Sequence, residues 1–150
     1  MRKILFAFLL VLILVSVGFA VYHNREWSIP KDAKTLKNPV APSEAALKSA
    51  RLLYLDNCVN CHGDKGKGDG SEAMMYDPGP ADLTDAKDMA RVTDGEIFYQ
   101  ITLGKKPMPS FKKRMTEEQR WQLVLLVRSF SAPAASAPEA DKTPAANPKQ

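Results

Sequence analysis

The chain has 150 residues, 45% of them hydrophobic, and carries a formal net charge of +4. This length and apolar share suffice for one small folded domain with extensions at its ends. For a structural zinc site the chain offers only two cysteines and two histidines. Because His23 lies far upstream of both cysteines in a polar segment, the composition argues against a structural zinc site, which needs four ligands.

Residues 1–22 form a hydrophobic run behind a basic start. After Arg2 and Lys3, residues 4–21 are uncharged and almost entirely apolar. Such a run just reaches the length needed to span a bilayer at about 1.5 Å per residue, and the basic N-terminus is predicted to stay inside. We therefore expect a single-pass anchor in the inner (cytoplasmic) membrane. A cleaved signal peptide is the alternative, because small residues near the end of the run resemble a cleavage site.

Residues 23–42 contain three prolines and several basic residues without apolar periodicity. We predict that this segment is a flexible linker that holds the following domain off the membrane. His23, at its start, is interpreted as a solvated juxtamembrane histidine.

Residues 43–131 are predicted to form an all-α domain, because no strand alternation persists in them. Ser43 followed by Glu44 is typical of a helix N-terminus. One apolar face recurs at three- and four-residue steps: Leu47, Ala50, Leu53 and Tyr54. We expect this helix to end at Asp56 or Asn57, directly before the first cysteine.

Cys58-Val59-Asn60-Cys61-His62 contains both cysteines of the chain. C-x-x-C-H is the attachment signature of c-type haem, in which the two thiols form thioethers with the haem and the histidine binds the iron. The sequence therefore predicts one haem c, covalently attached through Cys58 and Cys61, with His62 as an iron ligand. Such attachment resembles what bacteria do in the periplasm, which agrees with an anchored domain outside the inner membrane.

Two other interpretations of the cysteine pair were weighed. A thioredoxin-like dithiol sits at a strand-to-helix turn in a βαβ pattern, and the chain has no such pattern. A plain disulfide across two intervening residues would constrain almost nothing.

Two further helices have capping-box starts. Thr93 and Glu96 begin one that should stop at Gly104, and Thr116 with Gln119 begins another that continues to Phe130. Residues 132–150 are mostly Ala, Pro and Ser with a few charges, so we predict a disordered tail.

These features resemble a class I, monohaem cytochrome c domain over about residues 43–131. The resemblance implies three to five helices wrapped around one haem c, with crossing N- and C-terminal helices. The family usually has a glycine and an aromatic residue at that crossing, whereas this chain has Ala50 and Leu126. Alanine is larger than glycine and leucine is smaller than an aromatic residue, so this pair could preserve the contact volume. Leu126→Phe is then expected to overpack against Ala50.

The resemblance also implies the remaining site residues. A methionine from a late loop completes the iron coordination in the family, and Met108, between two prolines that oppose helix formation, is the candidate here. Met74, Met75, Met89 and Met115 are rivals. In Gly79-Pro80-Ala81-Asp82-Leu83, Pro80 matches the residue whose carbonyl accepts the Nδ1 proton of the ligand histidine, with Pro78 as the fallback.

If His62 and Met108 fill both axial positions, the expected role is outer-sphere electron transfer in a respiratory chain, without catalysis or a small-molecule substrate. Residues 64–96 contain nine acidic and four basic side chains, whereas Lys105, Lys106, Lys112, Lys113 and Arg114 form a purely basic run. This run beside Met108 predicts a redox partner with an acidic docking surface, such as a terminal oxidase or other respiratory complex. The acidic and basic residues of the domain balance, and no nucleic-acid partner is expected. A haem subunit of a larger oxidase or dehydrogenase, and a sensor or peroxidase with an open iron, remain alternatives.

Overall fold

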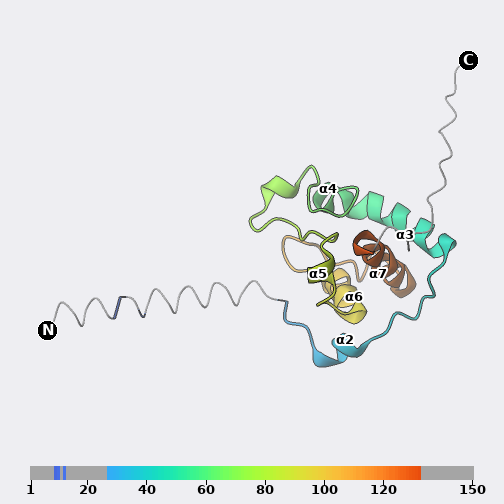
Figure 1. Cartoon of the computed structure of the whole chain (residues 1–150), viewed down its shortest axis with the longest axis horizontal. Helices are drawn as coiled ribbons and strands as arrows, with labels where there is room; N and C mark the ends of the chain where they lie inside the picture. Colours follow the sequence, from blue (N-terminus) through green and yellow to red (C-terminus); the bar gives the residue numbers. More distant parts are fainter. Residues whose placement is uncertain (1–8, 11, 13–26, 133–150) are drawn as a thin grey trace, which may run out of the picture. The chain divides into compact units, whose positions relative to one another are not determined.

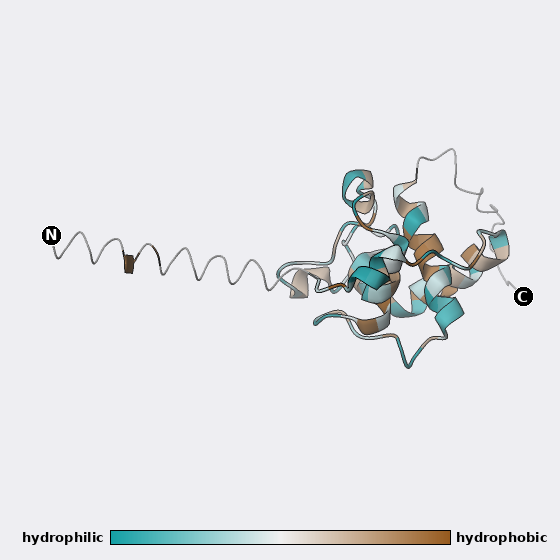
Figure 2. Ribbon diagram, turned by 90° about the horizontal axis from the view of Figure 1, so that it is seen from below, coloured by the Kyte–Doolittle hydropathy of each residue, from teal (hydrophilic) through white to brown (hydrophobic). Residues whose placement is uncertain are grey.

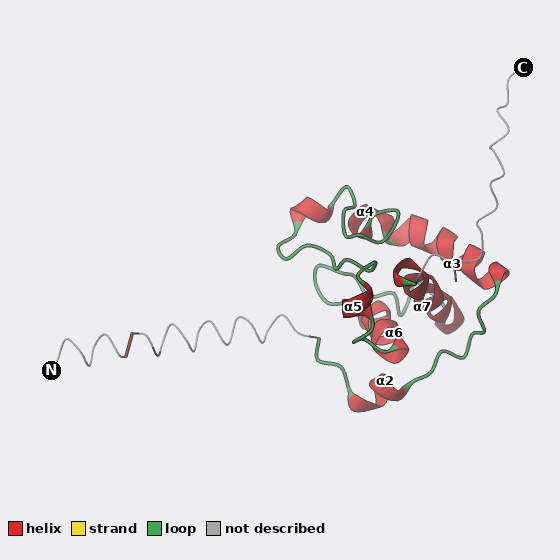
Figure 3. Cartoon of the chain, viewed as in Figure 1, coloured by secondary structure: helices red, strands yellow, loops and turns green. Residues whose placement is uncertain are grey.

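The computed structural model describes residues 9, 10, 12 and 27–132. Within these residues all regular structure is helical, which confirms the all-α prediction (Figures 1 and 3). The elements are α2 (Lys31–Thr35), α3 (Glu44–Asn57), α4 (Val59–His62), the short 3₁₀ helix η1 (Ala73–Met75), α5 (Ala86–Met89), α6 (Asp94–Leu103) and α7 (Glu117–Ser131).

The three longer helices begin where the sequence predicts. The Ser43 side chain accepts a hydrogen bond from the Ala46 amide and caps α3. Complete capping boxes open α6, between Thr93 and Glu96, and α7, between Thr116 and Gln119. Each box satisfies two amides that a helix start leaves without intrahelical partners, so these boundaries are fixed locally.

Helix α7 is the centre of the domain and packs against α3, α5 and α6. The contact between α3 and α7 is the most extensive of any pair of elements in the described part of the chain, as expected for crossing terminal helices. Ala50 of α3 is fully buried and Leu126 of α7 is almost fully buried. Both residues belong to the same hydrophobic core cluster, which agrees with their predicted place at the crossing.

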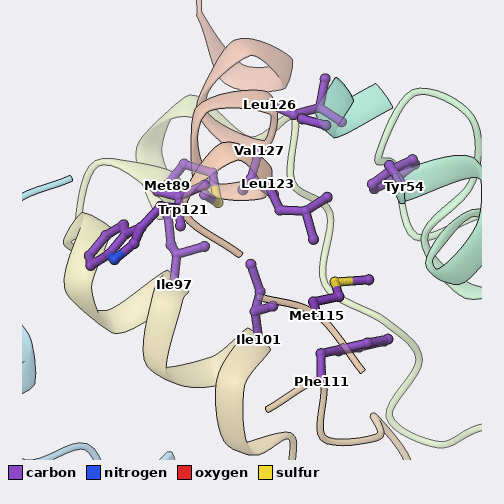
Figure 4. Close-up of a cluster of buried hydrophobic side chains, with 12 residues drawn as sticks. Tyr54, Met89, Ile97, Ile101, Phe111, Met115, Trp121, Leu123, Leu126 and Val127 are labelled. Atoms are coloured by element: carbon purple, nitrogen blue, oxygen red, sulfur yellow. The ribbon is translucent and has the colours of Figure 1, made fainter. Parts of the chain in front are cut away.

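The core joins α3, α5, α6 and α7 to the segment between the last two helices. In Figure 4 the side chains of Ile101, Leu123 and Met115 converge, with Phe111 beside them. The helices carry apolar and polar residues side by side along their length (Figure 2). One face of each helix can therefore supply the core while the other meets solvent.

Part of the segment predicted as a linker, residues 23–42, belongs to the domain, which begins at Lys31. Helix α2 packs against α6, and Ala33 is buried there. Gly95 permits this approach: a Cβ at that position would lie 1.8 Å from the Ala33 carbonyl oxygen. We call residues 31–40 the strap. Apolar periodicity could not reveal the strap, because five helical residues with one buried alanine give almost no pattern in the sequence.

Two polar contacts fasten the strap. Lys34 Nζ lies 3.2 Å from Glu96 Oε1 on α6, and Asn38 Nδ2 donates a 3.0 Å hydrogen bond to the Trp121 carbonyl on α7. Val40 packs against the hydrophobic core from the same segment. The strap therefore reaches both helices that flank the core.

Arg128 fixes the end of α7 through three hydrogen bonds. Arg128 Nε donates to Asp94 Oδ1 at 2.7 Å, which is also an ion pair. Its Nη1 donates to the Met89 carbonyl at 2.7 Å, and its Nη2 donates to the Val92 carbonyl. One guanidinium thus ties α7 to the end of α5 and the start of α6.

The unit Met1–Pro30 is separate from the domain unit that begins at Lys31. Of this first unit the structure describes Leu9, Leu10 and Leu12, which are helical and exposed, and residues 27–30. Among the described residues, no helix combines the length and apolar character that crossing a membrane requires. The predicted anchor lies largely outside these residues, as do His23 and the predicted tail beyond residue 132.

Candidate functional site

Cys58 lies between α3 and α4, and Cys61 lies on the single turn of α4 together with His62. Cys58 ends α3 through a 2.8 Å hydrogen bond from its amide to the Tyr54 carbonyl. Its own carbonyl then accepts from the His62 amide at 2.9 Å, which closes the turn. Both thiols are free and partly exposed. The helix end therefore presents Cys58, Cys61 and His62 together.

The thiols are not tuned for dithiol chemistry. Burial, with the neighbouring Cys61, raises the pKa of Cys58 to about 12. Burial and the Glu72 carboxylate also raise the pKa of Cys61, whose Sγ lies 3.9 Å from Glu72 Oε2. Reactive cysteines of thiol oxidoreductases have lowered pKa values. The environment thus argues against the thioredoxin-like alternative.

His62 has an imidazole that the protein alone does not satisfy. Its Nδ1 is buried, and among the described residues it is the one buried side-chain nitrogen or oxygen without a hydrogen-bond partner. Burial lowers the pKa of His62, against an opposing contribution from the Ala81 carbonyl. The neutral form that burial favours is the form in which histidine binds metals.

The carbonyl that acts on His62 belongs to Ala81, one residue beyond the predicted Pro80. The Pro80 carbonyl lies instead against Gly68, where a Cβ would come within 2.5 Å of its oxygen. Because His62 Nδ1 has no hydrogen-bond partner in the described part of the chain, Pro80 as its acceptor stays a prediction; the Ala81 carbonyl lies in the same Gly79–Leu83 segment that the sequence indicates. Pro78, the fallback, is exposed.

The loop after His62 folds back over the turn. The amides of Gly68, Gly70 and Glu72 donate to the carbonyls of His62, Cys61 and Asn60 at 2.9, 3.2 and 2.8 Å. These bonds hold the backbone of the turn without any side chain. Further along, the Leu83 amide donates to the Gly66 carbonyl at 2.7 Å. The segment that carries Ala81 is thereby fixed beside the turn.

Tyr54 joins this loop to the core, a role that the sequence did not reveal. Its hydroxyl donates a buried 2.7 Å hydrogen bond to the Gly63 carbonyl. Its ring meets Phe130 of α7 edge-on, with 5.2 Å between centroids. Arg51, one turn earlier on α3, donates to the Asp64 carbonyl at 2.7 Å. Helix α3 therefore positions the residues directly after His62.

Met108 lies in a loop that is tied to the end of α6. Its amide donates to the Lys105 carbonyl at 2.9 Å, forming a tight turn. Gly104 precedes this turn with φ +63°, a conformation that favours glycine, and a Cβ there would lie 2.4 Å from the Pro109 carbonyl. After the turn, the Phe111 and Lys112 amides donate to the Ile101 and Thr102 carbonyls at 3.2 and 3.1 Å.

Met108 and Cys58 come from distant parts of the sequence, yet both are partly buried and pack against the same core cluster. The rival methionines are less suitable. Met74 and Met75 on η1 are 98% and 74% exposed, whereas Met89 and Met115 are buried in the core. Trp121 is also buried in that core, where it stacks on Phe98 with 4.0 Å between ring centroids.

The donor set fits a covalently held haem. Two free thiols and a histidine lie within five consecutive residues, and a half-buried thioether adjoins the same core as Cys58. Within the described part of the chain, no group of three or more Cys, His, Asp or Glu side chains could hold a metal ion by itself. The set therefore suits an iron brought in by a porphyrin better than a bare ion.

Comparisons with known proteins agree with this arrangement. Residues 45–127 match the family model described as cytochrome c oxidase, cbb3-type, subunit III. The similar solved structures include two c-type cytochrome or HAO-like proteins. The KustC0563 c-type cytochrome is 32% identical to this chain, and the TM-score is 0.49. The match covers 55% of this chain and 98% of that cytochrome.

The second is the Kuenenia stuttgartiensis reducing HAO-like protein complex Kustc0457/Kustc0458, with 29% identity and a TM-score of 0.54 over 74% of this chain. The chain spans only 54% of the length of that neighbour. No curated protein matches the chain. The matched family range contains the Cys58–His62 turn and Met108, and the chain belongs to this cytochrome c family, that of cbb3-type oxidase subunit III.

Proposed function

We propose that this chain is a membrane-tethered periplasmic electron carrier of a respiratory chain. It holds one haem c covalently through Cys58 and Cys61, with His62 and Met108 as the axial ligands. The bound haem would supply one-electron exchange between ferric and ferrous iron. The observation that carries this proposal is the short stretch that brings two free thiols and His62 together.

The protein's own part in this function is to hold the ligands in place. The Tyr54 hydroxyl and the glycine amides keep the Cys58–His62 turn in one backbone conformation. The bonds from the Met108 loop to the end of α6 do the same for the thioether. A site that changes little between oxidation states exchanges electrons with little rearrangement, and filling both axial positions leaves no place for oxygen or peroxide.

The charges around the Met108 loop support the proposed docking of an acidic redox partner. Four basic residues near this loop are exposed: Lys106, Lys112, Lys113 and Arg114. Within the part of the chain that the structure describes, none of them forms a salt bridge. Complementary charge accelerates encounter and is screened by salt. We expect charge reversal at Lys112 to slow electron transfer to an anionic oxidant at low ionic strength.

A second candidate function is a fixed haem subunit of a larger oxidase or dehydrogenase. Two findings favour it: the family description names an oxidase subunit, and a structural neighbour is titled as part of a protein complex. The chemistry at Cys58, Cys61, His62 and Met108 is the same in both cases. A complex that survives detergent purification would select the subunit; a monomer would select the carrier.

The membrane location rests on the uncharged run over residues 4–21. We propose a single-pass anchor in the inner membrane with the haem domain in the periplasm. Cell fractionation tests this: the full chain should stay with membranes after a high-salt wash, and recovery in the soluble periplasmic fraction would contradict the anchor.

Attachment and electron exchange can be tested on the purified protein. Intact-mass measurement should find one haem that survives denaturation, and Cys58→Ala with Cys61→Ala should lose it. Stopped-flow oxidation of the reduced protein by ferricyanide should slow in Lys112→Glu. The matched control is Lys87→Glu, an exposed lysine on α5. A polypeptide without covalent haem would contradict the proposed function, whereas equal rates for both lysine variants would contradict only the docking surface.

A further inference from the structure

Backbone bonds hold the Met108 loop against the end of α6, and the side chains of Ser110, Thr102 and Arg120 add contacts that the proposed function has not yet used. Helix α6 ends with carbonyls that have no partners within the helix. The Thr102 carbonyl accepts from the Lys112 amide at 3.1 Å and from Ser110 Oγ at 2.7 Å. Ser110 lies two residues after Met108, so this hydroxyl closes the loop close to the proposed ligand.

A buried arginine holds the other side of Thr102. Arg120 Nη1 donates to Thr102 Oγ1 at 2.9 Å, and its Nε donates to the Thr116 carbonyl at 3.3 Å. The guanidinium lies 5.0 Å from the centroid of the Phe98 ring, and Arg120 is only 7% exposed. A buried guanidinium in fixed contacts is expensive to move, so Thr102 is held rigidly.

We propose that Ser110 and Arg120 are positioning residues for Met108: acting through Thr102, they form a latch that sets how readily an added ligand displaces the thioether. The inference rests on the proposed function, because it takes Met108 to be the axial ligand. The latch is the pair of bonds from Ser110 Oγ to the Thr102 carbonyl and from Arg120 Nη1 to Thr102 Oγ1.

The physical basis is a pre-equilibrium between a closed and an open loop. An added ligand reaches the iron only when Met108 has left, so its apparent affinity scales with the fraction of open loop. Losing one side chain to backbone hydrogen bond weakens the closed state by an amount that changes this fraction about threefold to tenfold. Ser110 is exposed, so its removal leaves the core intact.

The experiment is a titration of the ferric holoprotein with imidazole, followed by loss of the near-infrared thioether-to-iron band. Ser110→Ala should bind imidazole about threefold to tenfold more tightly than wild type. Ser110→Thr, which keeps the hydroxyl, should stay close to wild type. Thr102→Val removes the hydroxyl that accepts from Arg120 but keeps the backbone carbonyl that accepts from Ser110. This variant should also bind imidazole more tightly than wild type.

Ser129→Ala is the matched control, because Ser129 Oγ also donates to a backbone carbonyl, that of Leu126, at 2.6 Å. It should leave imidazole affinity unchanged. Equal affinities for Ser110→Ala and wild type, or equal shifts for Ser110→Ala and Ser129→Ala, would overturn the latch. Met108→Ala separates the two levels: loss of the band supports the ligand assignment independently, whereas its survival would overturn both the assignment and the latch.

Discussion

Gly95→Ala should destabilise the domain, although the same change in an ordinary helix stabilises it. Gly95 is the second residue of α6, and within a helix alanine is better than glycine by at most about 1 kcal/mol. Here the new Cβ would lie 1.8 Å from the Ala33 carbonyl and 2.9 Å from Leu36 Cβ. Because the nearest atom belongs to the backbone, the strap must move away from α6.

The cost follows from the contacts that the strap makes. The Asn38 bond to the Trp121 carbonyl contributes about 1 kcal/mol. The Lys34–Glu96 pair contributes less, about 0.5 kcal/mol, because its lysine side chain is 53% exposed. Partial burial of Val40 adds about 1 kcal/mol. After the gain in helix propensity, we expect a net loss of about 1–2 kcal/mol in the free energy of unfolding.

Urea denaturation of the holoprotein, followed by circular dichroism, measures this loss. A double-mutant cycle with Asn38→Ala tests its cause. If Gly95→Ala displaces the strap, Asn38→Ala should cost about 1 kcal/mol in the wild type and almost nothing in the Gly95→Ala background. A Gly95→Ala variant that is more stable than wild type would refute the reasoning, as would an Asn38→Ala cost that is equal in both backgrounds.

Three further predictions concern stability. Tyr54→Phe should cost about 1–2 kcal/mol on urea denaturation, because the buried Gly63 carbonyl loses its donor; a neutral result would mean that water replaces the hydroxyl. Leu126→Phe should lower the melting temperature by overpacking the crossing at the fully buried Ala50, and a more stable variant would show that the two do not pair. At Glu96, burial raises the pKa, but hydrogen bonds from Thr93 and Lys34 outweigh it and leave the pKa below its usual value. A carboxyl group whose pKa is lower in the folded than in the unfolded state stabilises the fold at pH values above the unfolded pKa. This stabilisation is lost as the pH falls through the folded pKa. Denaturation of Glu96→Gln should therefore show its largest deficit at neutral pH and a shrinking one below about pH 4; a constant deficit would contradict this.

Local sequence signals predicted the helix boundaries well. Ser43, Thr93 and Thr116 each cap a helix through a hydrogen bond with a residue three positions later. The residues that make the signal in the sequence are therefore the residues that make the contact. The C-x-x-C-H motif is equally local, because Cys58 directly precedes the one-turn helix α4, on which Cys61 and His62 lie. The packing of α3 against α7 followed from the resemblance to class I cytochromes c.

The features that sequence missed depend on contacts between distant residues. The strap is visible only where Ala33 meets Gly95, because a glycine inside a helix does not reveal which backbone approaches it. The Ala81 carbonyl, next to the predicted Pro80, contributes to the pKa of His62, because the path of the loop decides which carbonyls come near the ring. Arg120 and Arg128 look like solvent-facing cations in sequence, although both use their guanidinium groups to join separate elements.

The absorption and magnetic circular dichroism spectra of the oxidised protein, recorded for wild type and Met108→Ala, test the central claim most directly. That claim is a closed site with His62 and Met108 as axial ligands. The account predicts a low-spin ferric spectrum with a near-infrared thioether-to-iron band that disappears in Met108→Ala. A high-spin wild-type spectrum that shifts on adding cyanide would contradict it, because the iron would then have an open position.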